Sequence, residues 1–495
     1  MNRASDCSVA ADSRLEAPAT GDFTFRDPAG QLRLTQFHAL RLIRPAATQE
    51  TLAFLDSRLN SELERSGDLV STEIAEPGSQ DFMQPGELWL RHPLVEPISY
   101  PWEWTVAQWR AAAELTLRVA DRAIDAGWNL KDATPLNIVF DGPRPVLVDV
   151  LSFERRDPQS NVWLAYGQFV RTFLLPLLAK KLLGWPLQAT LFARDGYEPR
   201  TLYQALWPWQ RLYPDLLDIV TLATLFEGRG GKTPAPRANP NPTPSDPDLI
   251  THILHKRIAR LRKQLHKAAA AEPPSRWSSY PQSATHYQAS HTDEKMQFVQ
   301  RVLGRCQPGL VLDIGANTGA FSLAAASSHA RVVSLDSDAA ALEVLLQSAT
   351  QNKLPISALV ANIARPTPAA GWQNREQLSL LQRLTGKFDL VLLLAVIHHL
   401  ILREQLPLPH IAELCASLTR RWLLLEWVPV TDPMYQEWLR GREALYGQLC
   451  EDDLLRAFDP HFSVVDRTVL GNQRVLLLLE RTSFAASDTS MSHAC

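Results

Sequence analysis

Two glycines and several polar residues follow an apolar stretch in the second half of the chain, in a spacing that suits a small ligand. Residues 310–312 end an apolar run and predict a buried parallel strand. Asp313, Gly315 and Gly319 come next, in the pattern Asp-x-Gly-x-x-x-Gly, before a predicted helix. Glycine permits a tight turn and close approach of the backbone to a ligand. The sequence therefore predicts either a ligand site on this turn, with Asn317 in its middle, or a purely structural strand, turn and helix.

This turn differs from the fingerprint of dinucleotide-binding folds. That fingerprint reads Gly-x-Gly-x-x-Gly and holds a pyrophosphate at the helix start. Here Ala316 and Asn317 stand where the second glycine would fall, and Asp313 precedes the turn. An acidic residue at this place favours a cationic or amine-bearing ligand over a pyrophosphate.

Polar side chains also end the next two predicted strands. Residues 331–336 end in Asp336, close to the offset at which an acidic residue meets a ribose in nucleotide-binding folds. Asp336 can accept hydrogen bonds from two ribose hydroxyls, or it can cap the following helix. Residues 357–362 end in Asn362, which can accept a hydrogen bond through its amide oxygen.

Further predicted strands complete an α/β sheet. Residues 388–394 lead into Ala395, residues 422–426 end in Glu426, and two final strands flank the turn at Gly471 and Asn472. Strands that alternate with helices, followed by a hairpin, predict a mostly parallel sheet with one antiparallel strand. Ligands of such sheets bind at the carboxyl ends of the strands.

Three residues beyond these strands are candidate catalytic groups. His398 and His399 follow the fourth strand, and a histidine with an ordinary pKa near ~6.5 can act as a base at neutral pH. The alternative is that they orient the loop or pack beneath the sheet. Glu426 is a further candidate on the same side, and its alternatives are a helix cap or a partner of an arginine.

The first half of the chain carries a second pattern. Asp132, Asn137 and Asp149 have the order and approximate spacing of the catalytic Asp and the metal-binding Asn and Asp of kinase-like folds. Leu130 replaces the usual His, and Val150 with Leu151 replaces the Phe-Gly that follows the metal-binding Asp. The pattern is consistent with three interpretations: active phosphotransfer, a kinase-like scaffold without that activity, and an unrelated α/β domain.

Composition narrows the class of protein. The chain has 495 residues with 45% hydrophobic and 21% charged residues, which is ordinary for a globular protein of two or three domains. A formal net charge of −3 does not favour nucleic acid. The five cysteines have no metal-ligand spacing, so we expect no metal and reduced thiols in the cytoplasm. The N-terminus lacks a signal peptide, and the apolar stretch 169–193 is too interrupted to span a membrane, so we expect no membrane partner.

The domain boundaries follow from changes in composition. Prolines crowd the region 228–247 and predict an extended linker. A helix with one apolar stripe and many basic residues follows, and it either binds an anionic partner or packs with a solvated face. The predicted segments are a disordered tail 1–22, an α+β domain 23–227, the linker 228–247, the basic helix and connection 248–290, an α/β domain 291–483 and a tail 484–495.

Eight sequence blocks carry a resemblance to a known family. They are Ile98-Ser-Tyr-Pro-Trp-Glu-Trp104, Leu130-Lys-Asp-Ala-Thr-Pro-Leu-Asn137, Val148-Asp-Val-Leu-Ser-Phe-Glu154, Ala165-Tyr-Gly-Gln-Phe169, Leu312-Asp-Ile-Gly-Ala-Asn-Thr-Gly319, Gly371-Trp-Gln-Asn-Arg-Glu376, Ala395-Val-Ile-His-His-Leu400 and Glu426-Trp-Val-Pro-Val-Thr-Asp-Pro-Met434. Through them the chain resembles bacterial class I S-adenosylmethionine (SAM) methyltransferases, some of them nodulation-protein-like. The resemblance implies a Rossmann-like domain and SAM as cofactor. It implies cofactor contacts at Asp313, Gly315, Asn317, Gly319, Asp336, Asn362 and Ala395.

The sequence as a whole predicts an enzyme, a SAM-dependent methyltransferase whose N-terminal domain recognises the substrate or regulates access. The alternative is a non-catalytic SAM-binding or scaffold protein that acts through its N-terminal domain. A nucleic-acid methyltransferase is not favoured, because His398-His399-Leu400 stands where enzymes that methylate base amines carry Asn/Asp-Pro-Pro-Tyr/Phe. The acceptor and the oligomeric state do not follow from the sequence.

Overall fold

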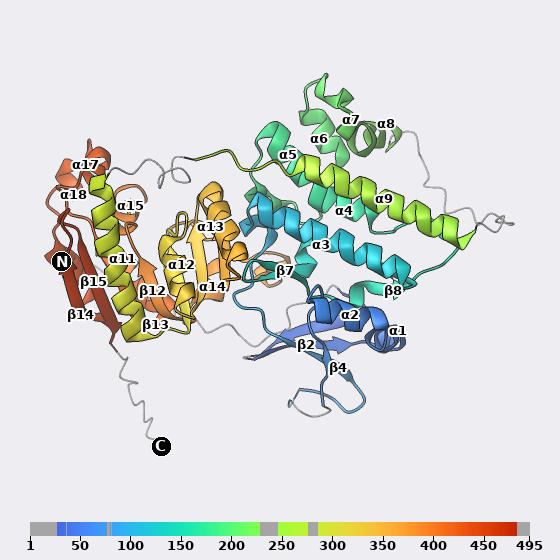
Figure 1. Cartoon of the computed structure of the whole chain (residues 1–495), viewed down its shortest axis with the longest axis horizontal. Helices are drawn as coiled ribbons and strands as arrows, with labels where there is room; N and C mark the ends of the chain where they lie inside the picture. Colours follow the sequence, from blue (N-terminus) through green and yellow to red (C-terminus); the bar gives the residue numbers. More distant parts are fainter. Residues whose placement is uncertain are drawn as a thin grey trace, which may run out of the picture.

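The computed structural model contains an N-terminal α+β domain and a C-terminal α/β domain (Figure 1). It describes residues 27–35, 37–76, 80, 82–227, 246–275 and 286–482. The predicted tails 1–22 and 484–495, and residues 228–245 of the predicted linker, lie outside the described residues.

Seven strands form the sheet of the C-terminal domain. They are β9 (Leu310–Ile314), β10 (Arg331–Asp336), β11 (Ile356–Val360), β12 (Phe388–Leu393), β13 (Thr419–Trp427), β14 (Phe462–Val469) and β15 (Val475–Arg481). Their order across the sheet is β11-β10-β9-β12-β13-β15-β14, and β15 runs antiparallel to both of its neighbours while the other strands are parallel. This arrangement confirms the predicted Rossmann-like class I methyltransferase sheet with one antiparallel strand.

Helices cover both faces of this sheet. One face carries α11 (His286–Cys306), α12 (Ala320–Ser327) and α13 (Ala339–Gln351), and the other carries α14 (Leu380–Leu384), α15 (Ile397–Leu402), α16 (Leu408–Leu418), α17 (Pro433–Leu439), α18 (Glu443–Tyr446) and α19 (Glu451–Phe458). Successive strand residues point to opposite faces, so Val311 packs in one core and Leu312 in the other. Burial on both faces explains why these strands are almost continuously apolar.

The N-terminal domain begins with an antiparallel sheet of order β1-β2-β4-β3. Its strands are β1 (Gly30–Leu34), β2 (His38–Ile43), β3 (Glu73–Ile74) and β4 (Leu88–Pro93), with α1 (Pro45–Leu55) and α2 (Arg58–Ser66) between β2 and β3. Then come α3 (Val106–Asp125) and two small antiparallel pairs, β5 (Trp128–Leu130) with β8 (Phe153–Arg155) and β6 (Ile138–Asp141) with β7 (Arg144–Leu147). Thr105 is the N-cap of α3 and forms a capping box with Gln108.

The rest of this domain is helical. Its helices are α4 (Tyr166–Phe169), the π-helical turn η4 (Val170–Leu174), α5 (Leu175–Leu183), α6 (Pro199–Ala205), α7 (Pro214–Leu216), the π-helical turn η7 (Leu217–Leu222), α8 (Ala223–Glu227) and α9 (Pro247–Ala268). The predicted apolar stripe of α9 is buried in the N-terminal core, and α9 lies along α3 (Figure 1). Residues 247–268 therefore pack with this domain, although the sequence assigns them to a separate segment. No helix of the described residues has the length and apolar character needed to cross a membrane.

Ion pairs between α9 and α3 create a pH dependence centred on His255. Its Nδ1 lies 2.6 Å from Asp121 and its Nε2 lies 2.8 Å from Asp125. Partial burial lowers the pKa of His255, but the hydrogen bond to Asp121 and the charges of both aspartates outweigh it, so the pKa is raised. The resulting stabilisation is complete below the unfolded pKa of about 6.5 and is lost as the pH rises through the folded pKa.

We therefore expect His255→Gln to lower the melting temperature more at pH 6 than at pH 8.5. His252→Gln is the matched control, because His252 lies exposed on the same helix and makes no ion pair with any described residue. Thermal melting of both variants at the two pH values checks this. An equal loss at both pH values would show that the charge of His255 does not contribute.

The two domains meet at the block 98–104, around the short 3-10 helix η1 (Pro101–Glu103). Glu103 is completely buried and forms an ion pair with Arg383 of α14, whose side chain is 2% exposed. Glu103 also accepts hydrogen bonds from the hydroxyl of Thr367 at 2.5 Å and from the backbone of Tyr100 at 3.0 Å. Arg383 donates in addition to the carbonyl oxygen of Ile98. This block is one of the eight that carry the family resemblance, and in the structure it forms the contact between the two domains.

The start of α3 adds a second contact, at the edge of the C-terminal sheet. Strand β11 is an edge strand, and the side chain of Gln108 donates to the carbonyl oxygen of Ala358 in it at 3.1 Å. Glu343 of α13 accepts a hydrogen bond from the backbone of Ala107 at 2.9 Å. The N-terminal domain therefore covers part of an edge whose backbone groups would otherwise lack partners.

Candidate functional site

A cavity of about 300 Å³ opens where β9, β10, β11 and β12 end. It is lined by Ile314, Gly315, Asn317, Leu335, Asp336, Ser337, Asp338, Ala361, Asn362, Ile363, Leu394, Ala395, Val396, His399, Leu400, Arg403 and Glu404. The carboxyl ends of parallel strands are where the sequence predicts a ligand. Five of the seven predicted cofactor residues line this cavity: Gly315, Asn317, Asp336, Asn362 and Ala395.

The turn after β9 forms one wall of the cavity. Gly315 has φ +75°, and a Cβ atom built on it would lie 2.4 Å from Cγ2 of Val396. Asn317 has φ +53°, and its backbone N–H donates to Asp336 at 2.8 Å. The side-chain oxygen of Asn317 is buried and has no hydrogen-bond partner among the described residues. A buried acceptor without a partner costs free energy, so this wall suits a ligand that donates a hydrogen bond.

Asp336 stands at the end of β10 as predicted. One carboxylate oxygen accepts from Asn317, and the other accepts from the backbone of Asp338 at 2.9 Å. Burial raises the pKa of Asp336, although backbone hydrogen bonds from Asp338 and Asn317 oppose this shift. Each oxygen keeps a lone pair for a ligand hydroxyl. Asp338, and not Asp336, caps α13 by accepting from Ala340 and Ala341.

Asn362 and Glu404 form the wall at the end of β11. The side-chain oxygen of Asn362 accepts from the backbone of Ala364 at 2.8 Å, and its amide nitrogen donates to Glu404 at 3.2 Å. Arg365 lies 2.8 Å from the second oxygen of Glu404. Sequence reasoning missed Glu404, because no motif connects it to a residue so far away along the chain.

The segment after β12 closes the cavity with an unusual backbone. Ala395 has φ +55°, in the left-handed region that residues other than glycine rarely adopt. Such strain persists where the surrounding structure enforces it, and it is frequent at functional sites. His399, four residues later on α15, lines the cavity. Burial and the charges of Arg403 and Arg474 lower the pKa of His399 to about 4, so its imidazole is neutral at pH 7.

Two predicted cofactor residues lie outside the cavity lining. Asp313 is buried and accepts from the hydroxyl of Ser322 at 2.6 Å, while burial raises its pKa to about 6. Its place in β9 turns the carboxylate toward α12. Gly319 is needed for packing, because a Cβ atom there would lie 2.2 Å from Leu345. Both residues thus stabilise the turn without lining the cavity.

His398 and Glu426, predicted as catalytic candidates, also lie outside this lining. His398 is buried and stacks on Trp438 of α17 at 5.3 Å between ring centroids, and burial is the main cause that lowers its pKa to about 2. For His398 the structure therefore corresponds to the packing alternative.

Glu426 lies in a buried cluster of charges. Its carboxylate contacts Lys295 of α11 and lies 3.3 Å from Arg474, which is also 2.8 Å from Asp432. Burial alone would raise the pKa of Glu426, but the charges of Lys295 and Arg474 outweigh it and lower the pKa. Glu426 matches the alternative of an arginine partner. Sequence reasoning missed Lys295, which carries no motif.

Of the three polar residues in the kinase-like pattern of the N-terminal domain, the structure brings Asn137 and Asp149 into contact. The side-chain amide of Asn137 lies 3.4 Å from Asp149, which also contacts Ser152 and lies 2.9 Å from Arg41 of β2. Burial, followed by the charge of Asp149, raises the pKa of Asp132. The described residues contain no group of His, Cys, Asp and Glu side chains that could hold a metal ion. In this domain the carboxylate of Asp149 is therefore engaged by Arg41 and Ser152.

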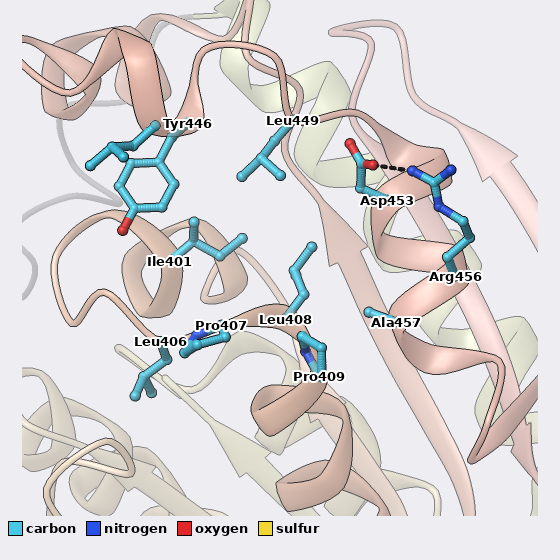
Figure 2. Close-up of a pocket in the computed structure, with 11 residues that line it drawn as sticks. Ile401, Leu406, Pro407, Leu408, Pro409, Tyr446, Leu449, Asp453, Arg456 and Ala457 are labelled. Atoms are coloured by element: carbon cyan, nitrogen blue, oxygen red, sulfur yellow. Dashed lines mark hydrogen bonds and ion pairs between the residues drawn. The ribbon is translucent and has the colours of Figure 1, made fainter. Parts of the chain in front are cut away.

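A second pocket, of about 470 Å³, lies on another side of α15 (Figure 2). Its lining comes from α15, the start of α16, α18 and α19, and it is mostly apolar. Asp453 and Arg456 form an ion pair within this lining, as Figure 2 shows. It contains none of the predicted site residues.

Comparison with known proteins gives one relative along nearly the whole chain. The chain is 29% identical over 489 residues to the nodulation protein NoeA of Rhizobium meliloti (strain 1021), and the match covers 95% of this chain and 99% of that protein. This match confirms the predicted resemblance to nodulation-protein-like proteins. No protein-family profile matches the chain.

Solved structures resemble the chain over a smaller part. They include magnesium protoporphyrin IX methyltransferase from Synechocystis PCC 6803 with bound S-adenosylhomocysteine (SAH), at 20% identity, 40% of this chain, 89% of that chain and TM-score 0.30. The N-methyltransferase NodS from Bradyrhizobium japonicum WM9 in complex with SAH matches at 16% identity, 41% of this chain, 91% of that chain and TM-score 0.30. The bifunctional kinase-methyltransferase WbdD matches at 22% identity, 39% of each chain and TM-score 0.28.

Proposed function

We propose that the protein is a SAM-dependent methyltransferase that acts on an acceptor still to be identified. The observation that carries the proposal is the cavity at the ends of β9 to β12, with Asn317, Asp336 and Asn362 along its wall. Its place in a mostly parallel sheet is the place where such folds bind ligands. The fold agrees with the proposal.

The cavity residues fit SAM group by group. Asp336 offers two carboxylate oxygens to ribose hydroxyls, and Asn362 offers its amide to an adenine. The unpartnered oxygen of Asn317 suits a donor such as the ammonium group of the methionine moiety. SAM supplies an activated methyl group when bound. The protein must then hold the acceptor in line with it, and positioning alone can contribute about 7–11 kcal/mol to lowering the barrier.

His399 is the proposed base for an acceptor that must lose a proton. It is the one predicted catalytic residue that lines the cavity, and it is neutral at pH 7 because its pKa is lowered to about 4. His398 and Glu426 would act on it only indirectly. His398 lies against the His399 ring at 4.5 Å between centroids, and Glu426 pairs with Arg474, whose charge contributes to the lowered pKa of His399.

Replacing Asp336 with alanine tests the cofactor part of the proposal. We expect SAM binding to the full chain to weaken by about 2–4 kcal/mol, roughly thirty-fold or more, because hydrogen bonds to a charged acceptor are lost. Titration calorimetry with SAM measures this. Asp459→Ala, on the exposed end of α19, is the control and should bind SAM as the wild type does. Equal affinity of a folded Asp336→Ala variant would remove Asp336 from the site.

The alternative function is a non-catalytic SAM-binding or scaffold protein that acts through its N-terminal domain. Conversion of SAM to SAH by the full chain in the presence of candidate acceptors separates the two. Turnover that His399→Ala reduces, at unchanged SAM affinity, supports the methyltransferase. Tight SAM binding without turnover on any acceptor class would favour the alternative.

A further inference from the structure

One part of the N-terminal domain exposes an unusual number of large apolar side chains. We call it the 207–226 patch, and it comprises Trp207, Trp209, Leu212, Tyr213, Leu217, Leu222, Leu225 and Phe226. These eight residues lie within a stretch of twenty, on the segments around α7, η7 and α8 and the short 3-10 helix η6 (Gln210–Leu212). Exposed apolar side chains are normal when scattered, but a concentration of them marks an interaction site.

The two tryptophans are the most distinctive members of the patch. Trp207 is 62% exposed and Trp209 is 58% exposed, and their rings stack at 5.1 Å with an interplanar angle of 11°. The segments that carry the patch are tied together, because the hydroxyl of Thr221 in η7 donates to the carbonyl oxygen of Arg211 at 2.5 Å. In Figure 1, α6, α7 and α8 lie at the edge of the molecule, on the far side of α9 and α3 from β2 and β4. The patch is thus carried by a peripheral group of short helices.

A row of basic side chains borders these helices. Lys256, Arg260, Lys263 and Lys267 follow one another on α9 at intervals of three or four residues, so they share one helix face. Arg260 lies 2.6 Å from Asp218 of η7, and Lys267 lies 2.6 Å from Asp215 of α7, which fixes this face against the patch-bearing segments.

Two cations of this row remain available to a partner. Lys256 and Lys263 are exposed and form no ion pair with any residue that the structure describes. They lie on the same face as the two cations that contact α7 and η7. The chain as a whole has a formal net charge of −3, so this local positive charge is not a reflection of the overall composition.

We propose that the 207–226 patch and the basic face of α9 together form a docking surface for an anionic lipid bilayer. Trp and Tyr favour the interface between water and lipid, Leu and Phe insert below it, and lysines beside them attract anionic headgroups. The lysines favour this occupant over a protein partner, because lysine, unlike the aromatic residues of the patch, is depleted in protein interfaces. Lying on a bilayer differs from crossing one. The proposal is therefore compatible with the lack of a membrane-crossing helix among the described residues.

Vesicle co-sedimentation of the full chain tests the proposal. The probes are phosphatidylcholine vesicles with and without about one-third phosphatidylglycerol. We expect the wild type to bind the anionic vesicles at least roughly tenfold more tightly than the neutral ones. Trp207→Ser with Trp209→Ser, and separately Lys256→Glu with Lys263→Glu, should each weaken binding to anionic vesicles by roughly tenfold or more.

Trp372→Ser is the matched control, because Trp372 is also 58% exposed but belongs to the C-terminal domain. It should bind anionic vesicles as the wild type does. All the substituted side chains are exposed, so each variant should keep the melting temperature of the wild type. Failure of the wild type to bind anionic vesicles would overturn the proposal, as would equal binding by the double tryptophan variant. Concentration-dependent dimerisation that the tryptophan variant abolishes would assign the patch to a second copy of the chain instead.

Discussion

Replacing Arg383 with methionine is expected to lower the free energy of unfolding by about 3–5 kcal/mol. Glu103 is completely buried and would lose its counter-charge while remaining out of reach of water. An uncompensated buried charge costs far more than the net contribution of the pair itself. Urea denaturation of the full chain, followed by circular dichroism, measures the change. Because the contact between Glu103 and Arg383 joins the two domains, the loss of stability should affect the unfolding of both domains.

Two further variants decide whether the unpaired charge is the cause. Glu103→Gln combined with Arg383→Met should be more stable than Arg383→Met alone, since the double variant leaves no isolated carboxylate. Lys387→Met removes a partly exposed ion pair with Glu96 at the same joint and should cost only about 0–1 kcal/mol. If Lys387→Met destabilised the protein as much as Arg383→Met, burial of the charge would not explain the effect.

Replacing Gly315 with valine is expected to abolish SAM binding, which means a loss of about 100-fold or more. A Cβ atom at this position would lie 2.4 Å from Cγ2 of Val396, and both residues line the cavity. The added side chain must push Val396 into the cavity or displace the turn. Titration calorimetry with SAM on the folded variant measures the loss, and retained affinity would mean that the turn is only structural.

Gly386→Val separates the steric effect from backbone strain. Gly386 has a comparable φ of +65°, but nothing lies within 4 Å of the added Cβ atom. It precedes β12, at the opposite end of the sheet from the cavity. This variant should therefore lose some stability and keep its SAM affinity. Adding Val396→Ala to Gly315→Val should restore part of the binding, because it removes the atom that the new side chain meets.

The sheet and most of the cavity were predictable because they depend on local signals. Continuous apolar runs define strands buried on both faces, and the polar residue that ends each run falls at the carboxyl edge. That rule places Asp336 and Asn362 in the cavity correctly. Asp313, which precedes the turn by two residues, lies outside the cavity lining and accepts a hydrogen bond from Ser322. Sequence spacing does not distinguish these two orientations.

The remaining differences come from contacts between distant parts of the chain. Lys295 and Arg474 decide the role of Glu426, and Trp438 determines the surroundings of His398. None of these partners lies near the residue it affects in the sequence. The joint around Glu103 lies in one of the blocks that carry the family resemblance, but a tyrosine, two tryptophans and a glutamate give no sign of which surface they meet.

The cover that Gln108 provides for Ala358 restricts how this protein can be divided or recombined. A C-terminal fragment produced alone would display the free rim of β11 and a cation at Arg383 without its counter-ion. The unpaired backbone groups of an edge strand can pair with strands of other molecules. The fragment should therefore aggregate unless that surface is redesigned. The segments around Glu103 and Arg383 are 280 positions apart along the chain but in direct contact. A chimera between two relatives should therefore take both segments from the same parent.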